Sequence, residues 1–465
     1  MSQLTGANGR SLPINTATYT TFAIWLLAAV VMAGRVAAQE APQCPFETAE
    51  AIAILETQTQ TLGAARSIVV DTEIRTDPGE VQDAIRAYLS HPQLAGSGTG
   101  NALVAYVSKG QAICVLYARL ADGRYVFDMI LLPKTADQIS ALIEENLAAF
   151  HHSGPQAPRA PRPRPEVEAT QQRSAKSLTQ RLQNDTRQPG VLLQEIAAVL
   201  FPSSLFSQLE LNARSLSIVP ALNMGRVPFS ALDLDGDGKP LIESTAINIE
   251  ASLKSVLDQT LYAWTPGLLR PAVFGDPDAT ADPDWLLPRL PGADREARRV
   301  AGLLGTQPVI GPDATKARFL RDTAASDYIH VAAHGLASAA DPMDKSFLAL
   351  SGERLTAREI QHLKLTGSPV VVLSACQTAL GGPLEAGIIG VSRAFLLAGG
   401  INVISSLWNV DDHATSEIMF GFVQNLASTN PAEALRLAQL SARSKWPDTR
   451  IWSAFVVYGA RIVSR

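Results

Sequence analysis

The second half of the chain predicts an α/β fold built on a mostly parallel sheet flanked by helices. From about Leu216 onward, short apolar runs alternate with segments of helical periodicity, which is typical of strands joined by crossover helices. The apolar runs are continuous, so both faces of each strand are expected to be buried. A length of 465 residues with 46% hydrophobic residues provides for two or three domains with cores of their own.

The elements of this half follow one another in a regular order. Its predicted strands are LSIV (216–219), AVFG (272–275), YIHVAA (328–333), VVVLSA (370–375), NVISSL (402–407) and AFVVYG (454–459). Helices are predicted over 293–305, 313–325 and 386–400, and after the pair Asp411-Asp412. Glycine at the end of the first helix, Gly305, agrees with the usual preference for glycine just past a helix.

The amino terminus resembles a secretory signal peptide. Residues 22–34, FAIWLLAAVVMAG, are an apolar run after Arg10, and small residues follow at 36–38, where cleavage would occur. The run is short for a membrane span, which needs about 20 residues. We therefore expect export to the periplasm or outside the cell and a mature chain that begins near Gln39. The alternative is that residues 22–34 are retained as a membrane anchor.

The part between the signal segment and the α/β half changes composition several times. It begins with amphipathic helical patterns, continues with β-rich runs separated by Lys109-Gly110 and Asp122-Gly123 turns, and then becomes rich in proline and arginine. The predicted parts are the signal peptide (1–38), a helical segment (39–96, with helices over 46–68 and 79–91), a small sheet with a β-meander (97–153), an extended linker (154–175) and the α/β domain (176–465).

The charge balance argues against a nucleic-acid partner. The net charge is -5, from 44 acidic and 39 basic residues, and no basic stripe is present that would neutralise phosphates.

A calcium loop is suggested by DLDGDGKPLIES (233–244), where Asp233, Asp235 and Asp237 occupy the first ligand positions of such a loop. The twelfth position is Ser244 instead of a bidentate glutamate, so we expect no calcium and interpret Asp237-Gly238 as a hairpin turn.

Three cysteines occur, and their number leaves at least one outside any intrachain disulfide. In an oxidising compartment Cys44 and Cys114 could pair and leave Cys376 free. The alternative is that Cys114 is a small buried hydrophobic residue in the strand AICVLYA.

Two residues with catalytic chemistry stand at predicted strand ends. His334 follows YIHVAA and Cys376 follows VVVLSA, and in open α/β sheets the working crevice lies at the carboxyl ends of the strands. A cysteine nucleophile needs an imidazole nearby to accept its proton, because a free thiol is mostly protonated at neutral pH. We therefore expect the two side chains to approach to about 3 to 4 Å. His330 is expected to pack within its strand, and His413 to lie on a helix surface.

The motifs around these residues resemble the CHAT family of caspase-like and separase-like cysteine peptidases. The similarity rests on YIHVAAHG, LTAREIQHLKL, PVVVLSACQTALGG, GIIGVSRAFLLAGGINVISSLWNVDDHAT and WSAFVVYG, and on upstream segments from 216 and 290. It implies a caspase-like sheet preceded by a smaller, degenerate pseudo-peptidase half. It also implies that His334 is the base, that Cys376 is the nucleophile, and that the backbone N–H groups of Gly335 and Cys376 form the oxyanion hole.

The resemblance leads to a cysteine endopeptidase that hydrolyses protein or peptide substrates without a metal or organic cofactor. A catalytically silent scaffold that binds peptides in the same cleft is the alternative. Asp411 and Asp412 follow the strand NVISSL beside the Cys376 strand, where a carboxylate would favour Arg or Lys before the cleaved bond. Equally, either aspartate could simply cap the helix that follows.

Overall fold

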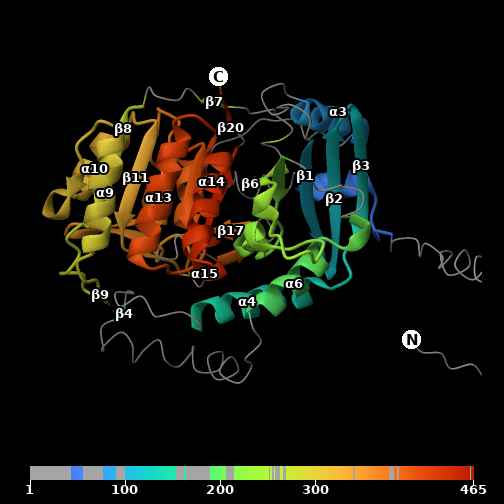
Figure 1. The fold of residues 1–465 in the computed structure, drawn as a ribbon, viewed down its shortest axis with the longest axis horizontal. Coiled ribbons are helices and arrows are strands. Elements are labelled where there is room, and N and C mark those ends of the chain that lie inside the picture. The colour runs from blue at the N-terminus through green and yellow to red at the C-terminus, as the bar shows by residue number, and fades with distance from the viewer. Residues whose placement is uncertain are drawn as a thin grey trace, which may run out of the picture. The chain divides into compact units, whose positions relative to one another are not determined.

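An 11-stranded sheet forms the centre of the computed structural model (Figure 1). From one edge to the other its strands are β10 (Val309–Ile310), β8 (Pro271–Gly275), β11 (Tyr328–Ala333), β15 (Val370–Ala375), β18 (Asn402–Ser406), β19 (Phe455–Gly459), β6 (Ala246–Ile249), β5 (Ser215–Val219), β1 (Asn101–Lys109), β2 (Ala112–Ala121) and β3 (Arg124–Leu131). The structure describes residues 43–55, 77–90, 100–152, 162–163, 189–205, 214–250, 252–253, 256, 262–264, 269–338, 341–375, 382–384, 387–460 and 462–464.

The sheet consists of two parallel blocks that run in opposite directions. Strands β10, β8, β11, β15 and β18 are parallel to one another, and so are β19, β6, β5 and β1. The blocks meet where β18 pairs antiparallel with β19, and β2 and β3 extend the second block as an antiparallel meander. The predicted mostly parallel α/β sheet is confirmed. The meander is not a separate small sheet, however, because β1 pairs directly with β5.

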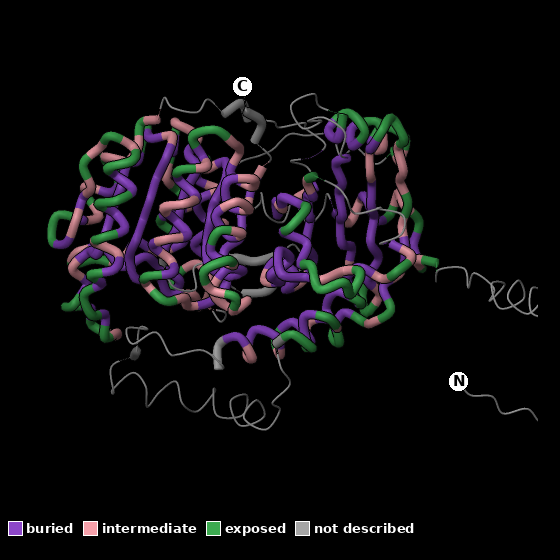
Figure 2. The backbone as a smooth tube through the Cα atoms, in the orientation of Figure 1, coloured by how far each residue is buried: buried purple, intermediate pink, exposed green. Residues whose placement is uncertain are grey.

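Helices cover both faces of the first block. On one face α9 (Pro291–Leu303) and α13 (Asp412–Leu426) lie side by side, and α14 (Pro431–Lys445) continues this layer beside α13, over β19 and β6 of the second block (Figure 1). On the other face α10 (Lys316–Thr323), α11 (Ala357–Gln361) and α12 (Val391–Leu397) bury Phe319, Ile360 and Phe395 against the strands. The strands between these layers are buried along their length (Figure 2). Burial on both faces explains why these strands are continuous apolar runs in the sequence.

Further helices accompany the second block. Residues 48–55 are helical, and the longer helices are α3 (Pro78–Leu89), α4 (Ala136–His152) and α6 (Pro189–Leu200). The sequence predicted the first two, with the helix over 46–68 continuing beyond the described residues, but it did not predict α4 or α6. Asp77 caps α3 by accepting a hydrogen bond from the Glu80 backbone N–H.

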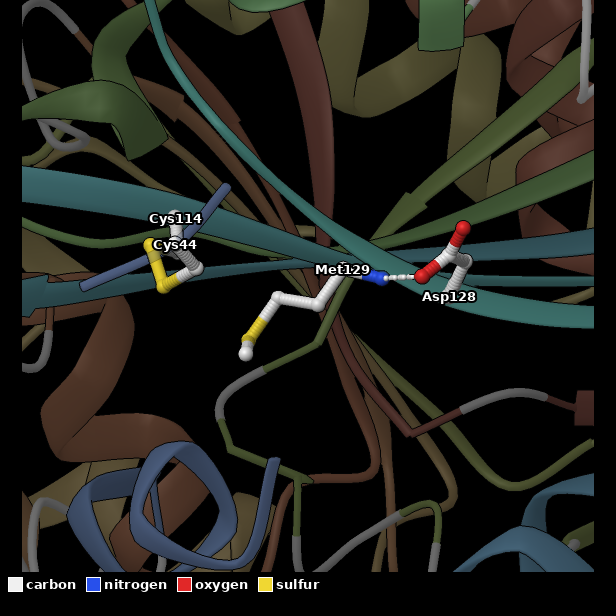
Figure 3. Close-up of a disulfide and its surroundings, with 4 residues drawn as sticks. All are labelled: Cys44, Cys114, Asp128 and Met129. Atoms are coloured by element: carbon white, nitrogen blue, oxygen red, sulfur yellow. Dashed lines mark hydrogen bonds between the residues drawn. A yellow bond between two sulfur atoms is a disulfide. The ribbon is translucent and has the colours of Figure 1, made fainter. Parts of the chain in front are cut away.

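A disulfide joins Cys44 to Cys114 inside the core of this block (Figure 3). Cys114 is fully buried on β2, so both alternatives considered for it hold together: it packs as a core residue and it is paired. The disulfide fixes the chain just before the helix at 48–55 to β2, the strand next to the edge strand β3. Near it, on the edge strand β3, Asp128 accepts a hydrogen bond from the Met129 backbone N–H at 2.7 Å. A charged side chain at this position is a common device against edge-to-edge pairing of sheets.

Several small elements complete the fold. A three-stranded sheet is formed by β12 (Gly335–Leu336), β13 (Phe347–Leu350) and β14 (Glu353–Thr356). Strands also pair two by two: β16 (Gly382–Leu384) with β17 (Gly387–Ile389), β4 (Arg162–Pro163) with β9 (Trp285–Leu286), and β7 (Tyr262–Trp264) with β20 (Ile462–Ser464). The remaining elements are the helix α15 (Thr449–Trp452) and the 3-10 turns η1 (Met224–Arg226), η2 (Phe229–Ala231), η3 (Leu241–Glu243) and η4 (Gly311–Asp313). The helix predicted over 386–400 begins only at Val391, because residues 387–389 pair with β16.

The loop around Asp237-Gly238 differs from its predicted form. Asp237-Gly238 is not a hairpin turn, because it lies in a loop between η2 and η3 with no flanking strands. The signal segment and most of the predicted linker lie outside the described residues. Within the part of the chain that the structure describes, no helix combines the length and the hydropathy that a membrane span requires.

Candidate active site

His334 stands at the carboxyl end of the central parallel strand β11. All six residues of β11 are buried between β8 and β15, and His334, which follows directly, is 3% exposed. Its backbone carbonyl accepts a hydrogen bond from the Ala349 N–H of β13 at 2.9 Å. The main chain of His334 is therefore held by the small β12–β13–β14 sheet, and its ring lies at the sheet edge where α/β proteins place their sites.

The hydrogen bond of the His334 ring determines which nitrogen carries the proton. Nε2 lies 2.7 Å from the backbone carbonyl oxygen of Pro288. A carbonyl oxygen only accepts, so Nε2 must be the protonated donor. Nδ1 is buried and has no hydrogen-bond partner within the described ranges. The neutral ring thus presents the lone pair of Nδ1 for accepting a proton.

Burial lowers the pKa of His334 below its ordinary value. The hydrogen bond to Pro288 and the negative charges of Asp276 and Asp412 act in the opposite direction, but their combined effect is smaller. An imidazole with a lowered pKa is neutral at neutral pH and can serve as a base. The same carbonyl and carboxylates would stabilise the imidazolium once a proton has been accepted.

Cys376 lies outside the described residues, so its distance from His334 stays a prediction. The described strands show the register that precedes these two residues: Ala333 of β11 is paired with Ala375 of β15, and the two strands are parallel neighbours. Gly335, the predicted oxyanion residue, begins β12 and is paired with Leu348. Its role in binding an oxyanion also stays a prediction.

A cleft opens at this edge between β11, β15 and the amino-terminal ends of α9 and α13. Its lining includes Leu290, Gly292, Ala333, Ser374, Ser406 and Asp412. The Ser374 Oγ is buried and, like the His334 Nδ1, finds no hydrogen-bond partner in the described part of the chain. Buried polar atoms are normally paired. Two such atoms at the ends of neighbouring strands therefore need an explanation, and a catalytic role is one that accounts for them.

The structure separates the roles of Asp411 and Asp412. Strand β18 lies next to β15, as predicted. Asp411 is the N-cap of α13, and its Oδ1 accepts hydrogen bonds from the backbone N–H groups of His413 at 2.9 Å and Ala414 at 3.1 Å. Asp412 instead lines the cleft. The capping alternative therefore applies to Asp411, and the role of Asp412 in binding a substrate side chain stays a prediction.

The other histidines near the sheet have partners of their own. His330 is fully buried, with Nε2 2.8 Å from Glu296 Oε1 and Nδ1 3.1 Å from the Tyr328 hydroxyl. Burial, followed by the charge of Glu296, raises the pKa of Tyr328 well above its ordinary value. His330 is packed within its strand as predicted. His413 is exposed at the start of α13, where its ring meets Trp446 edge to face.

Sequence reasoning missed the residues that hold His334. Pro288, whose carbonyl accepts from the ring, and Asp276, whose charge acts on it, lie in the segment between β8 and α9. The available signal was Gly275-Asp276-Pro277 directly after an apolar strand, because a polar residue at a strand end in this fold faces the crevice.

Among the described residues, Asp233, Asp235 and Asp237 form one group of carboxylates close enough together to share a cation. Asp233 uses both oxygens to accept the backbone N–H groups of Gly236 and Gly238. These contacts shape the loop and do not by themselves indicate a metal.

Comparison with known proteins identifies the family to which these motifs belong. The CHAT domain model matches residues 190–460, more than half of the chain. Tetratricopeptide repeat protein 28 from Mus musculus is 26% identical over 301 residues, and the same protein from Homo sapiens is 26% identical over 300 residues. Each match covers 54% of this chain but spans only 12% of the relative.

Solved structures of cysteine peptidases show weaker similarity. The separase–securin complex of Saccharomyces cerevisiae aligns with a TM-score of 0.48 at 10% identity, over 91% of this chain and 35% of that chain. The Arg-specific cysteine proteinase gingipain R aligns with a TM-score of 0.39 at 12% identity, over 63% of this chain and 73% of that chain.

Proposed function

The chain belongs to the CHAT domain family, and on that premise we propose that it is a cysteine endopeptidase with Cys376 as nucleophile and His334 as base. One observation carries the proposal. The His334 ring is held by the Pro288 carbonyl so that its Nδ1, which has no partner among the described residues, is left to accept a proton, directly after the paired residues Ala333 and Ala375. Side chains alternate along strands, so an extended continuation of β15 would direct Cys376 to the same face as Ser374.

The proposed reaction begins with proton transfer from the Cys376 thiol to the Nδ1 of His334. The thiolate attacks the peptide carbonyl carbon, and the oxygen of the tetrahedral intermediate accepts hydrogen bonds from the backbone N–H groups of Gly335 and Cys376. The C–N bond breaks as His334 returns its proton to the leaving amine. Water, deprotonated by His334, then hydrolyses the thioester and restores the thiol. Pro288, Asp276 and Asp412 favour the imidazolium that forms in each step.

For the substrate we propose a peptide with Arg or Lys before the cleaved bond. Asp412 supports this preference, because its carboxylate lines the cleft at the start of α13. A cation in a partly desolvated cleft gains a charge-assisted hydrogen bond from such a group. Asp411 is not included, because its Oδ1 is engaged as the helix cap.

We also propose that the protein works in an oxidising compartment after export. The disulfide between Cys44 and Cys114 supports this, because disulfides persist outside the cytosol and are rare within it. Cleavage near Gln39 would leave Cys44 in the mature chain. Amino-terminal sequencing of purified protein tests export: a chain that begins near Gln39 supports it, and membrane-bound protein that begins at Met1 or Ser2 supports the anchor.

A peptide probe with an electrophile directed at cysteine tests the catalytic proposal. Stoichiometric labelling that is lost in Cys376→Ala and slowed in His334→Ala, together with cleavage of a peptide library, is the expected result. Peptide binding by the intact protein without labelling or cleavage would instead support the alternative function, a scaffold that holds peptides in the cleft.

A further inference from the structure

We propose that Asp276 is a positioning residue that acts through the segment 288–290 to keep the His334 ring in the tautomer needed for proton acceptance. This inference rests on the proposed function, because it assigns a role within the same site. Within the described part of the chain, the Asp276 carboxylate accepts hydrogen bonds from Arg289 and Leu290 and not from the His334 ring. Its effect is transmitted by the main chain of the segment that carries the Pro288 carbonyl.

Asp276 is fixed at the end of β8, next to the strand that carries His334. Its backbone N–H donates to the Ala332 carbonyl at 2.9 Å, which ties it to β11 two residues before His334. Its side chain is only 5% exposed. Its φ is 44°, in the left-handed region that non-glycine residues seldom adopt. A buried carboxylate on a strained backbone costs stability, and such features are concentrated at functional sites.

The Asp276 carboxylate holds two consecutive residues of the segment. Oδ1 accepts the Leu290 backbone N–H at 2.5 Å, and Oδ2 accepts the Arg289 side chain from Nε at 3.0 Å and from Nη2 at 2.7 Å. The residue immediately before these two is Pro288, whose carbonyl accepts the His334 Nε2–H at 2.7 Å. Oδ1 thus restrains the peptide unit that adjoins the acceptor of the histidine proton, and Oδ2 holds the side chain of Arg289 in the same segment.

Asparagine at this position would release the segment while preserving its volume. The amide oxygen accepts one hydrogen bond, but the NH2 group would face a second donor, either the Leu290 N–H or the Arg289 guanidinium. The segment would then move from its place, and the Pro288 carbonyl would no longer lie opposite Nε2. Without that acceptor the ring is free to carry its proton on either nitrogen, and in the wrong tautomer Nδ1, the nitrogen proposed to accept the thiol proton, is already protonated.

The charged groups around His334 define the expected pH behaviour. Asp276 acts from the end of β8 and Asp412 from the start of α13. Arg289 pairs with Asp276, and Glu296 on α9 is tied to His330. On the side of β13 the contact is the uncharged Ala349 N–H. Asp276 and the Pro288 carbonyl both raise the pKa of His334. A variant that weakens both interactions should therefore lower the pKa of His334 further.

Asp282 provides a matched control. It is also 5% exposed and accepts hydrogen bonds from Arg354 at 2.7 and 2.5 Å and from the backbone N–H groups of Asp284 and Trp285. None of these contacts is with the segment 288–290. Asp282→Asn therefore removes a buried carboxylate with the same kind of partners, without disturbing the acceptor of the His334 proton.

The deciding experiment is ¹⁵N NMR of the His334 ring in full-length Cys376→Ala protein, which removes the thiol from the titration. The signal is assigned among the seven histidines by its loss in His334→Ala. We expect the Nε2–H tautomer alone in this background. In Asp276→Asn we expect a substantial Nδ1–H fraction and a lower titration midpoint, and in Asp282→Asn neither change. An unchanged tautomer and midpoint in Asp276→Asn, or the same change in both variants, would overturn the inference.

Kinetics of the enzyme with Cys376 intact give a second measurement. Asp276→Asn should lower kcat by a factor on the order of 10 to 100, and this loss should exceed any rise in KM caused by movement of Leu290 in the cleft, because the base itself is misplaced. A loss confined to KM would contradict the positioning role. If the intact protein cleaves no peptide, the proposed function fails, but the NMR result still decides whether Asp276 orients His334.

Discussion

Gly292 allows α9 to approach Asp412, so replacing it with alanine tests how the cleft is built. A Cβ on Gly292 would lie 2.6 Å from the Asp412 Cβ and 2.8 Å from its Oδ2. Ordinary van der Waals contact begins at 3.4 Å, so Asp412 or the start of α9 must move by about 0.8 Å, the difference between 3.4 and 2.6 Å. Gly292→Ala should therefore displace the carboxylate proposed to bind the substrate.

The change in stability caused by each glycine-to-alanine substitution is the sum of two opposing effects. Overpacking a buried contact typically costs about 1–3 kcal/mol, whereas alanine in place of glycine within a helix gains up to about 1 kcal/mol. Gly302 lies in the same helix and has no atom within 4 Å of the position of an added Cβ. Gly302→Ala should therefore raise the thermal unfolding midpoint, while Gly292→Ala lowers it.

The functional measurement compares two peptides that differ only in Arg or Ala before the cleaved bond. In Gly292→Ala the ratio of kcat/KM for Arg over Ala should fall by a factor on the order of 10 or more, because a misplacement near 1 Å costs up to about 100-fold in rate. Gly302→Ala should keep the wild-type ratio. Equal unfolding midpoints in the two variants, or a preserved Arg preference in Gly292→Ala, would refute this account of the cleft.

Three further predictions follow from the site and the disulfide. Because burial lowers the pKa of His334, kcat/KM should rise with pH through a midpoint below 6.5, the ordinary pKa of histidine. The folded state should lose stability as pH falls below 6.5 through the lowered pKa, because the unfolded chain binds this proton more readily. A midpoint of kcat/KM above 6.5 would contradict this prediction. Cys44 and Cys114 are 70 residues apart, so reducing their disulfide should lower the free energy of unfolding of the Cys376→Ala protein in urea by about 4 kcal/mol. A decrease of less than about 1 kcal/mol would show that the disulfide contributes little. Asp411→Ala should cost about 1 kcal/mol of stability and leave the preference for Arg before the cleaved bond unchanged, because Asp411 caps α13. Asp412→Asn should reduce that preference while the peptide probe still labels Cys376. The opposite result in the two variants would mean that Asp412 is the cap and Asp411 binds the substrate.

Local sequence patterns were sufficient to predict the strands of the first block except the short β10. Strands β8, β11, β15 and β18 are continuous apolar runs because each is covered on both faces, and that burial is visible in the sequence without knowledge of the neighbours. His334 was found for the same reason, as a polar residue directly after such a run. The family motifs then assigned it a role, and the CHAT domain match confirms the family.

The arrangement of the second block was not predictable in this way. The strand β19 looks like the others in sequence, yet it runs antiparallel to β18 and joins the two blocks into one sheet. An apolar run specifies that a strand is buried but contains no information about its direction or its neighbours. Those depend on which surfaces fit when the chain is folded. The same limit explains why the meander over 102–132 was expected to form a small sheet of its own.

The sequence by itself determined the two-sided burial of the strands, the histidine at the end of β11 and the cysteines available for pairing, because these depend on residue type and short-range pattern. Only the tertiary structure decided how the histidine is oriented and which aspartate lines the cleft. Pro288 is 46 residues from His334 in the chain, and its contribution is a backbone carbonyl, which every residue possesses. Asp411 and Asp412 are adjacent and chemically identical, and they differ only in where the start of α13 directs each carboxylate. Contacts of this kind have no pattern in the sequence, because they arise from the three-dimensional positions of groups that are distant along the chain or identical in type.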